Sequence, residues 1–284
     1  MNSSSPDNFE LSPPTDVPAG GESLTVDRAI ANLAGTDLGL RFYAAWWLGR
    51  FRVNEPQAVA ALITALADED DRTPEGGYPL RRNAARALGK LDDKSAVPGL
   101  IKSLESTDYY LREAAAESLG TLGDARAIPP LNNLLLTQLK AGEFIPQQGE
   151  YKQPYDAILE ALGNLGAKES TPYIQPFLTH PTELVQYSAA RAMYQLTQEA
   201  IYGERLVRAL AGDNLQLRRA ALGDLGAIGY LPAADAIAQT LAENSLKIIS
   251  LRGLLKHEVG QMTPPTPTLS ESAIKVMKLM DSLL

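Results

Sequence analysis

The chain has 284 residues, a net charge of −8 and 45% apolar residues, which is enough apolar surface to build a core. The acidic balance argues against general affinity for nucleic acid or an anionic membrane, and no stretch is long and apolar enough for membrane insertion. The absence of cysteine excludes disulfides, thiolate metal sites and covalent thioether attachment to this chain. With only His180 and His257 available, no metal site is expected.

Residues 1–23 are rich in Pro, Ser, Asp and Gly, with only scattered apolar residues, and are predicted to form a flexible N-terminal segment. They contain no apolar h-region of the kind found in secretory signals, so we expect a cytoplasmic protein. A first capping helix is expected from about Thr25 to Leu33, with Thr25 as its N-cap.

Residues 24–260 repeat one pattern, with apolar residues at offsets 0, 4, 8 and 11 from the start of each copy. These offsets share one face of a helix. A period near 30 residues with helical content is typical of stacked helix pairs, so we predict an all-α, right-handed α-solenoid of HEAT-like repeats, with about six helix pairs and no sheet. The copies begin at Leu40, Leu80, Leu111, Pro154, Val185 and Leu217.

Glycine recurs at offset nine of five copies, where it costs roughly 1 kcal/mol relative to alanine inside a helix. Its recurrence predicts close crossings of neighbouring helix backbones. Further glycines fall where a left-handed residue would end the first helix of a pair, and proline falls in the first turn of the second helix. The helix-ending positions are Gly123, Gly166 and Gly229, with Asp92-Asp93 in the second copy, and the prolines are Pro98, Pro129 and Pro172.

Two copies carry insertions, at residues 68–79 and 137–153. Insertions in repeat arrays project from one side and often carry function; the alternative is tolerated surface length. Beyond the repeats, residues 261–268 are predicted to be a Pro/Thr linker. Residues 269–284 are predicted to be a helix that caps the solenoid or docks on a partner. Its N-cap is Ser270 and its apolar stripe is Ile274, Met277, Met280 and Leu284.

No P-loop, dinucleotide-binding glycine pattern or nucleophile elbow is present. Arginine, however, recurs at offset one, and in two copies a second arginine follows. The arginines either pair with acids between repeats, such as Asp37 and Asp108, or form a basic strip along the inner curve that suits carboxylate ligands. The arginines are Arg41, Arg81, Arg112 and Arg218 at offset one, with Arg82 and Arg219 after them.

Aromatic residues gather in the same first three copies. Adjacent residues on a helix point in different directions, so Trp46 and Trp47 cannot both enter one core, and the same holds for Tyr109 and Tyr110. At least one member of each pair is expected to face solvent or a ligand. The alternative is that one tryptophan packs in the core and the other lies at the seam between repeats.

The segments LRRNAARALGKLDD and LREAAAESLGTLGD resemble the HEAT-like repeat of the bilin lyase family. Together with RFYAAWWLGRFRV and the two Tyr/Arg segments GGYPLRR and DYYLRE, they are similar to the E-type subunit of heterodimeric phycocyanin α-subunit phycocyanobilin lyases. The resemblance implies a heterodimer with an F-type lyase subunit. Such an enzyme attaches phycocyanobilin, which is a substrate and not a cofactor, through a thioether to a cysteine of the phycocyanin α-subunit.

Phycocyanobilin carries two propionates and a long π-system, which arginine and aromatic side chains complement. An acid near the ring nitrogens would help to polarise the chromophore, and Asp108 or Glu113 would serve. The alternative function is a non-catalytic HEAT-repeat scaffold that binds phycobiliproteins in phycobilisome assembly or degradation. The predicted contacts are Arg41, Arg82 and Arg112 for the propionates, and Trp46, Trp47, Tyr78, Tyr109 and Tyr110 for stacking.

Overall fold

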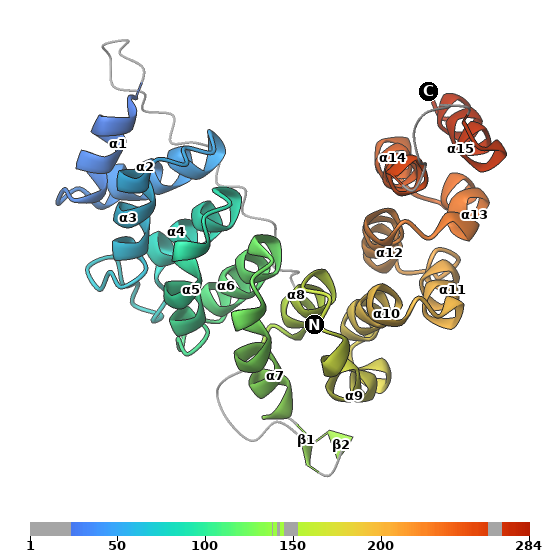
Figure 1. Ribbon diagram of the computed structural model, residues 1–284, viewed down its shortest axis with the longest axis horizontal. Helices are drawn as coiled ribbons and strands as arrows, with labels where there is room; N and C mark the ends of the chain where they lie inside the picture. The colour runs from blue at the N-terminus through green and yellow to red at the C-terminus, as the bar shows by residue number, and fades with distance from the viewer. Residues whose placement is uncertain (1–23, 138, 141–142, 145–152, 261–268) are drawn as a thin grey trace, which may run out of the picture.

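The computed structural model describes residues 24–137, 139–140, 143–144, 153–260 and 269–284, and in them the chain is a curved array of helices in two layers (Figure 1). Each inner helix packs against the inner helices before and after it. The all-α solenoid of HEAT-like pairs is therefore confirmed. The predicted segments 1–23 and 261–268 lie outside the described residues. The inner layer consists of α2 (Leu38–Arg50), α4 (Pro79–Lys90), α6 (Tyr109–Leu122), α8 (Tyr155–Asn164), α10 (Glu183–Thr197), α12 (Leu215–Ile228) and α14 (Asn244–Gly260).

The outer helices follow the convex side of the curve, and most begin with a short 3-10 turn. The last helix of the chain packs on α14, which makes a seventh pair where about six were expected. The outer layer consists of α3 (Pro56–Ala65), α5 (Val97–Ser103), α7 (Ile128–Leu136), α9 (Thr171–Ile174), α11 (Ala200–Ala209), α13 (Ala234–Gln239) and α15 (Glu271–Asp281), with α1 (Val26–Leu33) before the first pair.

The offset-nine glycines lie where inner helices cross. A Cβ atom added to Gly120 would lie 2.7 Å from the Cα of Ala161 on the next inner helix. Such an approach is closer than side chains allow, so the glycine sets the spacing of the two backbones. The prediction of close backbone crossings is confirmed, and it explains why a residue unfavourable in helices recurs there.

The helix-ending signals are also confirmed. Gly123 and Gly229 adopt left-handed backbone conformations with φ of 64° and 66°, which satisfy the last carbonyls of α6 and α12. Asp92 takes the same conformation, with φ of 56°, in the second repeat. Thr25 and Ser270 cap α1 and α15 through hydrogen bonds from backbone amides.

Two details of the prediction were wrong. Among the described residues there is one short ladder, in which β1 (Leu139–Lys140) pairs antiparallel with β2 (Glu143–Phe144) inside the second insertion, because an extended segment can satisfy its backbone groups by folding on itself. On α15 the buried residues are Ala273 and Val276, whereas Ile274 and Met277 of the predicted stripe are each 41% exposed. The face of α15 that packs is set by α13 and α14, which the local pattern does not include.

None of the described helices combines the length and the apolar character needed to cross a bilayer.

Candidate functional site

The concave face of the solenoid is built from offsets two and six of the repeats. These offsets lie roughly half a helical turn away from the core-facing offsets zero, four and eight, so their side chains point away from the outer layer. The inner helices that carry them line the inside of the curve (Figure 1). Along the array these residues are Phe42 and Trp46, Arg82 and Arg86, Glu113 and Glu117, Asp156 and Glu160, Tyr187 and Arg191, then Arg219 and Gly223.

The concave face therefore changes character along the six repeats: aromatic in the first, basic in the second, acidic in the third and fourth, and basic again in the fifth and sixth. Charges of neighbouring helices meet across it. Arg86 Nη2 lies 4.0 Å from Glu113 Oε2, and Arg191 Nη1 lies 2.7 Å from Glu160 Oε2. Arg86 is also exposed to solvent, and Arg191 also pairs with a second acid, Asp224. The surface therefore keeps polar groups that can bind a ligand.

Two carboxyl groups on this face titrate near neutrality. Burial, with the nearby charges of Glu117 and Asp156, raises the pKa of Glu113 to about 7 against the opposing effect of Arg86. Burial likewise raises the pKa of Glu160 to about 7, although Arg191 lowers it. A carboxyl group of this kind is partly protonated at neutral pH and can donate as well as accept a hydrogen bond.

The two acids proposed from the sequence have different surroundings. The carboxylate of Asp108 is buried; it caps α6 by accepting from the amide of Tyr110 at 3.0 Å, and it also accepts from the amide of Tyr78 at 2.8 Å. The neighbouring arginine, Arg82, donates to it at 2.6 Å through Nε. Because these donors occupy the carboxylate oxygens of Asp108, few acceptor sites remain for a ligand. Glu113 is therefore the candidate acid.

Arg82 faces the concave side and contacts one of the predicted aromatic residues. Its guanidinium carbon lies 4.8 Å from the ring centroid of Tyr110, and that ring is 45% exposed. The side chain of Arg82 is 24% exposed. Arg82 and Tyr110 thus present a charged and an aromatic surface side by side, held in place by Asp108.

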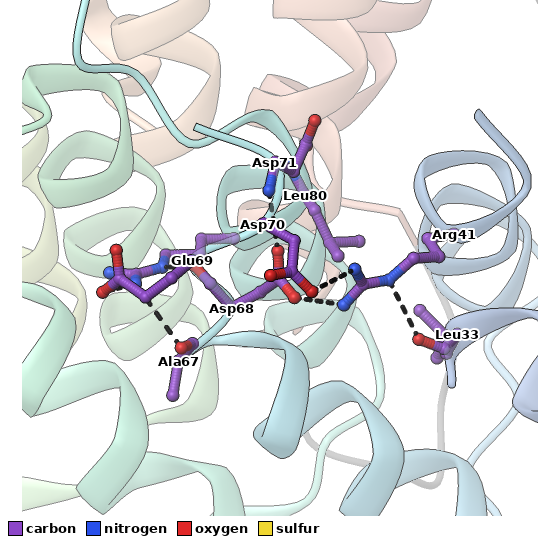
Figure 2. A network of polar contacts seen from close by, with 9 residues as sticks. Leu33, Arg41, Ala67, Asp68, Glu69, Asp70, Asp71 and Leu80 are labelled. Carbon is purple, nitrogen blue, oxygen red and sulfur yellow. Dashed lines mark hydrogen bonds and ion pairs between the residues drawn. The ribbon is translucent and has the colours of Figure 1, made fainter. Parts of the chain in front are cut away.

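Arg41 lies at the edge of the array and is bound into the protein (Figure 2). Its Nε donates to the carbonyl of Leu33 at 3.2 Å, and its other nitrogens pair with Asp68 and Asp70 of the first insertion. It is 9% exposed. The prediction that arginines pair with acids holds for Arg41, but the partner is not Asp37, whose side chain caps α2.

The first insertion is anchored to the repeats at several points. Arg81 pairs with Glu69 and donates to the carbonyl of Asp68. Asp71 accepts from the amide of Leu80 at 2.7 Å, and both residues are drawn in Figure 2. The bond to Asp71 satisfies one backbone amide at the start of α4, which lacks a side-chain cap from its own N-cap residue. At least this part of the insertion, residues 68–71, has a structural role.

Three other predicted contact residues, Arg112, Tyr109 and Tyr78, are buried or half-buried. Arg112 is buried and donates to the carbonyl of Ser106 at 2.6 Å, and its guanidinium carbon lies 6.0 Å from the ring centroid of Tyr109. Burial raises the pKa of Tyr109 above its ordinary value. Tyr78 is buried beneath Arg81, whose guanidinium carbon lies 3.9 Å from the ring centroid.

The adjacent aromatic pairs divide as expected. Trp46 is 38% exposed and stacks on Tyr43 with ring centroids 5.5 Å apart. Trp47 packs against the hydrophobic core and contacts Phe51. Of the eight predicted residues, the structure therefore leaves Trp46, Arg82 and Tyr110 most open to a ligand.

The sequence prediction missed most of the charged residues of the concave face, because it considered the arginines at offset one and the residues directly after them. The available signal was the recurrence of charge at offsets two and six among alanines and leucines, since a helical repeat has no structural need for charge there. The residues missed are Arg86, Glu117, Asp156, Glu160 and Arg191. In the described part of the chain, no group of three or more His, Asp or Glu side chains is arranged to hold a metal ion.

Comparison with known proteins gives consistent matches. A family model described as HEAT repeats matches residues 78–140, and one described as PBS lyase HEAT-like repeat matches residues 40–68. The chain is 65% identical over 266 residues to phycocyanobilin lyase subunit alpha of Microchaete diplosiphon, covering 92% of this chain and 90% of that protein. It is 48% identical over 234 residues to the bilin biosynthesis protein PecE of Nostoc sp. PCC 7120, covering 82% of this chain and 87% of that protein.

A solved structure is also similar over its whole length. It is the complex of CpcE and CpcF of phycocyanin lyase from Nostoc sp. PCC7120, in which the matching chain is 57% identical with a TM-score of 0.80. The match covers 99% of this chain and 100% of that one.

Proposed function

This chain belongs to the phycocyanobilin lyase alpha-subunit family, and on that premise we propose that it is one subunit of a heterodimeric bilin lyase. With an F-type partner it binds phycocyanobilin and attaches the bilin to a cysteine of the phycocyanin α-subunit. The observation that carries this proposal is the identity to lyase alpha subunits over nearly the whole chain. The lower identity to PecE supports phycocyanin as the acceptor.

The reaction joins a thiol to a carbon–carbon double bond. The acceptor sulfur bonds to the ethylidene carbon of ring A, the double bond becomes single, and the thiol proton is balanced by protonation of the adjacent ring carbon. No electrons are gained or lost, so the bilin is a substrate and no cofactor is required. The lyase contributes by holding one bilin conformer beside one thiol, which supplies orientation and excludes side reactions.

The concave face supplies the groups that such positioning requires. Arg82 and Arg86 suit the propionates, because guanidinium groups bind carboxylates with paired hydrogen bonds. The exposed faces of Tyr110 and Trp46 suit the π-system. Glu113, partly protonated near neutral pH, suits the pyrrole nitrogens or a ring carbonyl.

The remaining predicted contacts act through these residues. Arg41 and Tyr78 are buried and hold the first insertion and the start of α4 in place. Arg112 and Tyr109 form the same kind of support one repeat further on.

We assign the protein to the cytoplasm, because the acceptor must offer a free thiol and reducing compartments keep cysteines in that form.

The test is reconstitution of the transfer reaction. The chain is incubated with an F-type partner, phycocyanobilin and the apo form of the phycocyanin α-subunit, with each lyase subunit omitted in turn. Covalent, fluorescent product that needs both subunits is expected, and an acceptor whose cysteine is replaced by serine should give none. Binding of the acceptor without bilin transfer would favour the non-catalytic scaffold instead.

A further inference from the structure

The junction between α10 and α12 differs from the other contacts between successive inner helices. At the other five, a glycine of one inner helix faces an alanine or serine of the next, as Gly226 faces Ser250, whose Cα would lie 2.8 Å from an added Cβ. In α10 the equivalent position is Tyr194, and the facing position in α12 is Asp224. Contacts between α10 and α12 are accordingly sparser than those between other successive inner helices.

The hydrophobic core divides at the same place. One cluster of buried apolar residues runs from Ala29 on α1 to Leu196 on α10. A second cluster begins at Ala190 and continues to Val276 on α15. Ala189 and Ala190 of α10 belong to different clusters, so the two clusters meet at this helix, where the partly buried Leu178 and Tyr202 pack against both.

Polar and aromatic contacts take the place of close backbone packing at this boundary. Arg191 Nη1 lies 3.0 Å from Asp224 Oδ1, and Asp224 is 6% exposed. The Nε of Arg191 is buried and has no hydrogen-bond partner. Tyr194 meets Tyr230 edge to face, with ring centroids 5.2 Å apart and planes at 82°.

These contacts resist relative movement less than the glycine crossings do. Interlocked backbones admit no change of spacing without a clash, whereas an ion pair and an edge-to-face ring contact survive small rotations. The buried Nε–H of Arg191 also has no hydrogen-bond partner that would hold it in this arrangement. Domain motions in proteins concentrate at such interruptions of a packed core.

We propose that the α10–α12 junction is a hinge about which the arm formed by α11 to α15 rotates relative to the arm formed by α1 to α10. Rotation there changes the distance between the two ends of the curve, and with it the width of the concave face (Figure 1). Of the two ion pairs of Arg191, the pair with Glu160 lies within the first arm and the pair with Asp224 crosses the hinge, so rotation changes only the second.

The absence of cysteine makes the test direct. Spin labels are attached to two full-length double variants and their distance distributions are measured by pulsed electron paramagnetic resonance. Gln175→Cys with Gln239→Cys spans the hinge, from the fourth repeat to the sixth. Lys102→Cys with Gln175→Cys is the matched control, from the second repeat to the fourth, and all three positions are exposed.

We expect the distribution across the hinge to be roughly twofold wider than the control, or to contain two populations. Equal widths for the two pairs would overturn the proposal. Replacing the ion pair by apolar residues, with Arg191→Met and Asp224→Leu, should narrow the first distribution and leave the control unchanged. A first distribution that stays wide in this variant would contradict the role of the ion pair in permitting rotation at the hinge. The comparison of the two label pairs in the native sequence does not depend on the folding of this variant.

Discussion

At the scale of single residues, Arg41 and Arg82 have similar charges but different surroundings. Arg41→Gln leaves Asp68 buried without its partner, so we expect a loss of stability of about 3 kcal/mol with unchanged bilin affinity of the folded protein. Arg82→Gln removes the partner of the buried Asp108, so it too should lose stability, but it should in addition weaken bilin binding of the folded protein about tenfold, the usual effect of losing one charged hydrogen bond. The measurements are urea unfolding and a bilin titration for each variant. Arg208→Gln, on the convex side, is the control, and weakened binding in that variant would contradict the proposed site.

Glu113 is expected to make stability depend on pH. Its folded pKa is raised from 4.5 to about 7, so the folded state holds the proton more tightly than the unfolded state. Stability from this group is complete below its unfolded pKa and is lost as pH rises through about 7. Glu113→Gln cannot ionise, so its stability relative to the native chain should increase between about pH 5 and about pH 8. Urea unfolding of both chains at these two pH values checks this, and a difference that does not change with pH would show that Glu113 has an ordinary pKa.

At the scale of helices, the glycine crossings can be tested in isolation. Gly120→Ala places a methyl group against the backbone of α8, and overpacking of this kind typically costs about 1–3 kcal/mol. Gly223→Ala is the matched control, because it lies inside α12 with nothing within 4 Å of the added atom. It should be neutral or stabilising by up to about 1 kcal/mol. Thermal unfolding of the two variants distinguishes them, and equal melting temperatures would mean that the crossing tolerates a side chain.

Only some features of the helices could be predicted from the sequence. Their positions, their glycine crossings and their ends follow from periodicity, because each repeat meets the same neighbours and therefore needs the same residues. The partners of Arg41 did not follow, because Asp68 and Asp70 belong to an insertion that has no periodicity. The packed face of α15 depends on α13 and α14, which no local pattern encodes. The concave charges were readable at offsets two and six, but the shift in pKa of Glu113 requires the three-dimensional arrangement.

At the scale of the whole molecule, we expect the functional unit to be a heterodimer. The concave face exposes the aromatic residues Trp46 and Tyr110, and exposed aromatic surface of this kind is typical of a binding interface. The isolated chain should therefore be less stable than the complex, or should associate with itself. Light scattering and thermal unfolding with and without the F-type partner measure this. A monomer that is fully active and equally stable alone would contradict the expectation.

The divided core predicts a second property of the whole molecule. Repeat proteins unfold as a sum of local units and their interfaces, and here the contacts between successive inner helices are sparsest between α10 and α12. Urea unfolding should therefore occur in two steps, with the tyrosines around Tyr230 in one step and Trp46 and Trp47 in the other. Tryptophan fluorescence and helical circular dichroism should give different midpoints. Coincident midpoints would show a single cooperative unit.

The order of residues along the concave face gives the array a direction. From α4 to α12 the five inner helices are basic, acidic, acidic, basic and basic, so basic helices lie on both sides of the acidic ones. The stacked pair of Tyr43 and Trp46 lies at one end only. A long ligand with near-symmetric charges, laid along this surface, would be insensitive to head-to-tail reversal if charge alone guided it. The aromatic end breaks that equivalence, so we expect α2 to determine which end of the ligand points out of the array toward an incoming nucleophile.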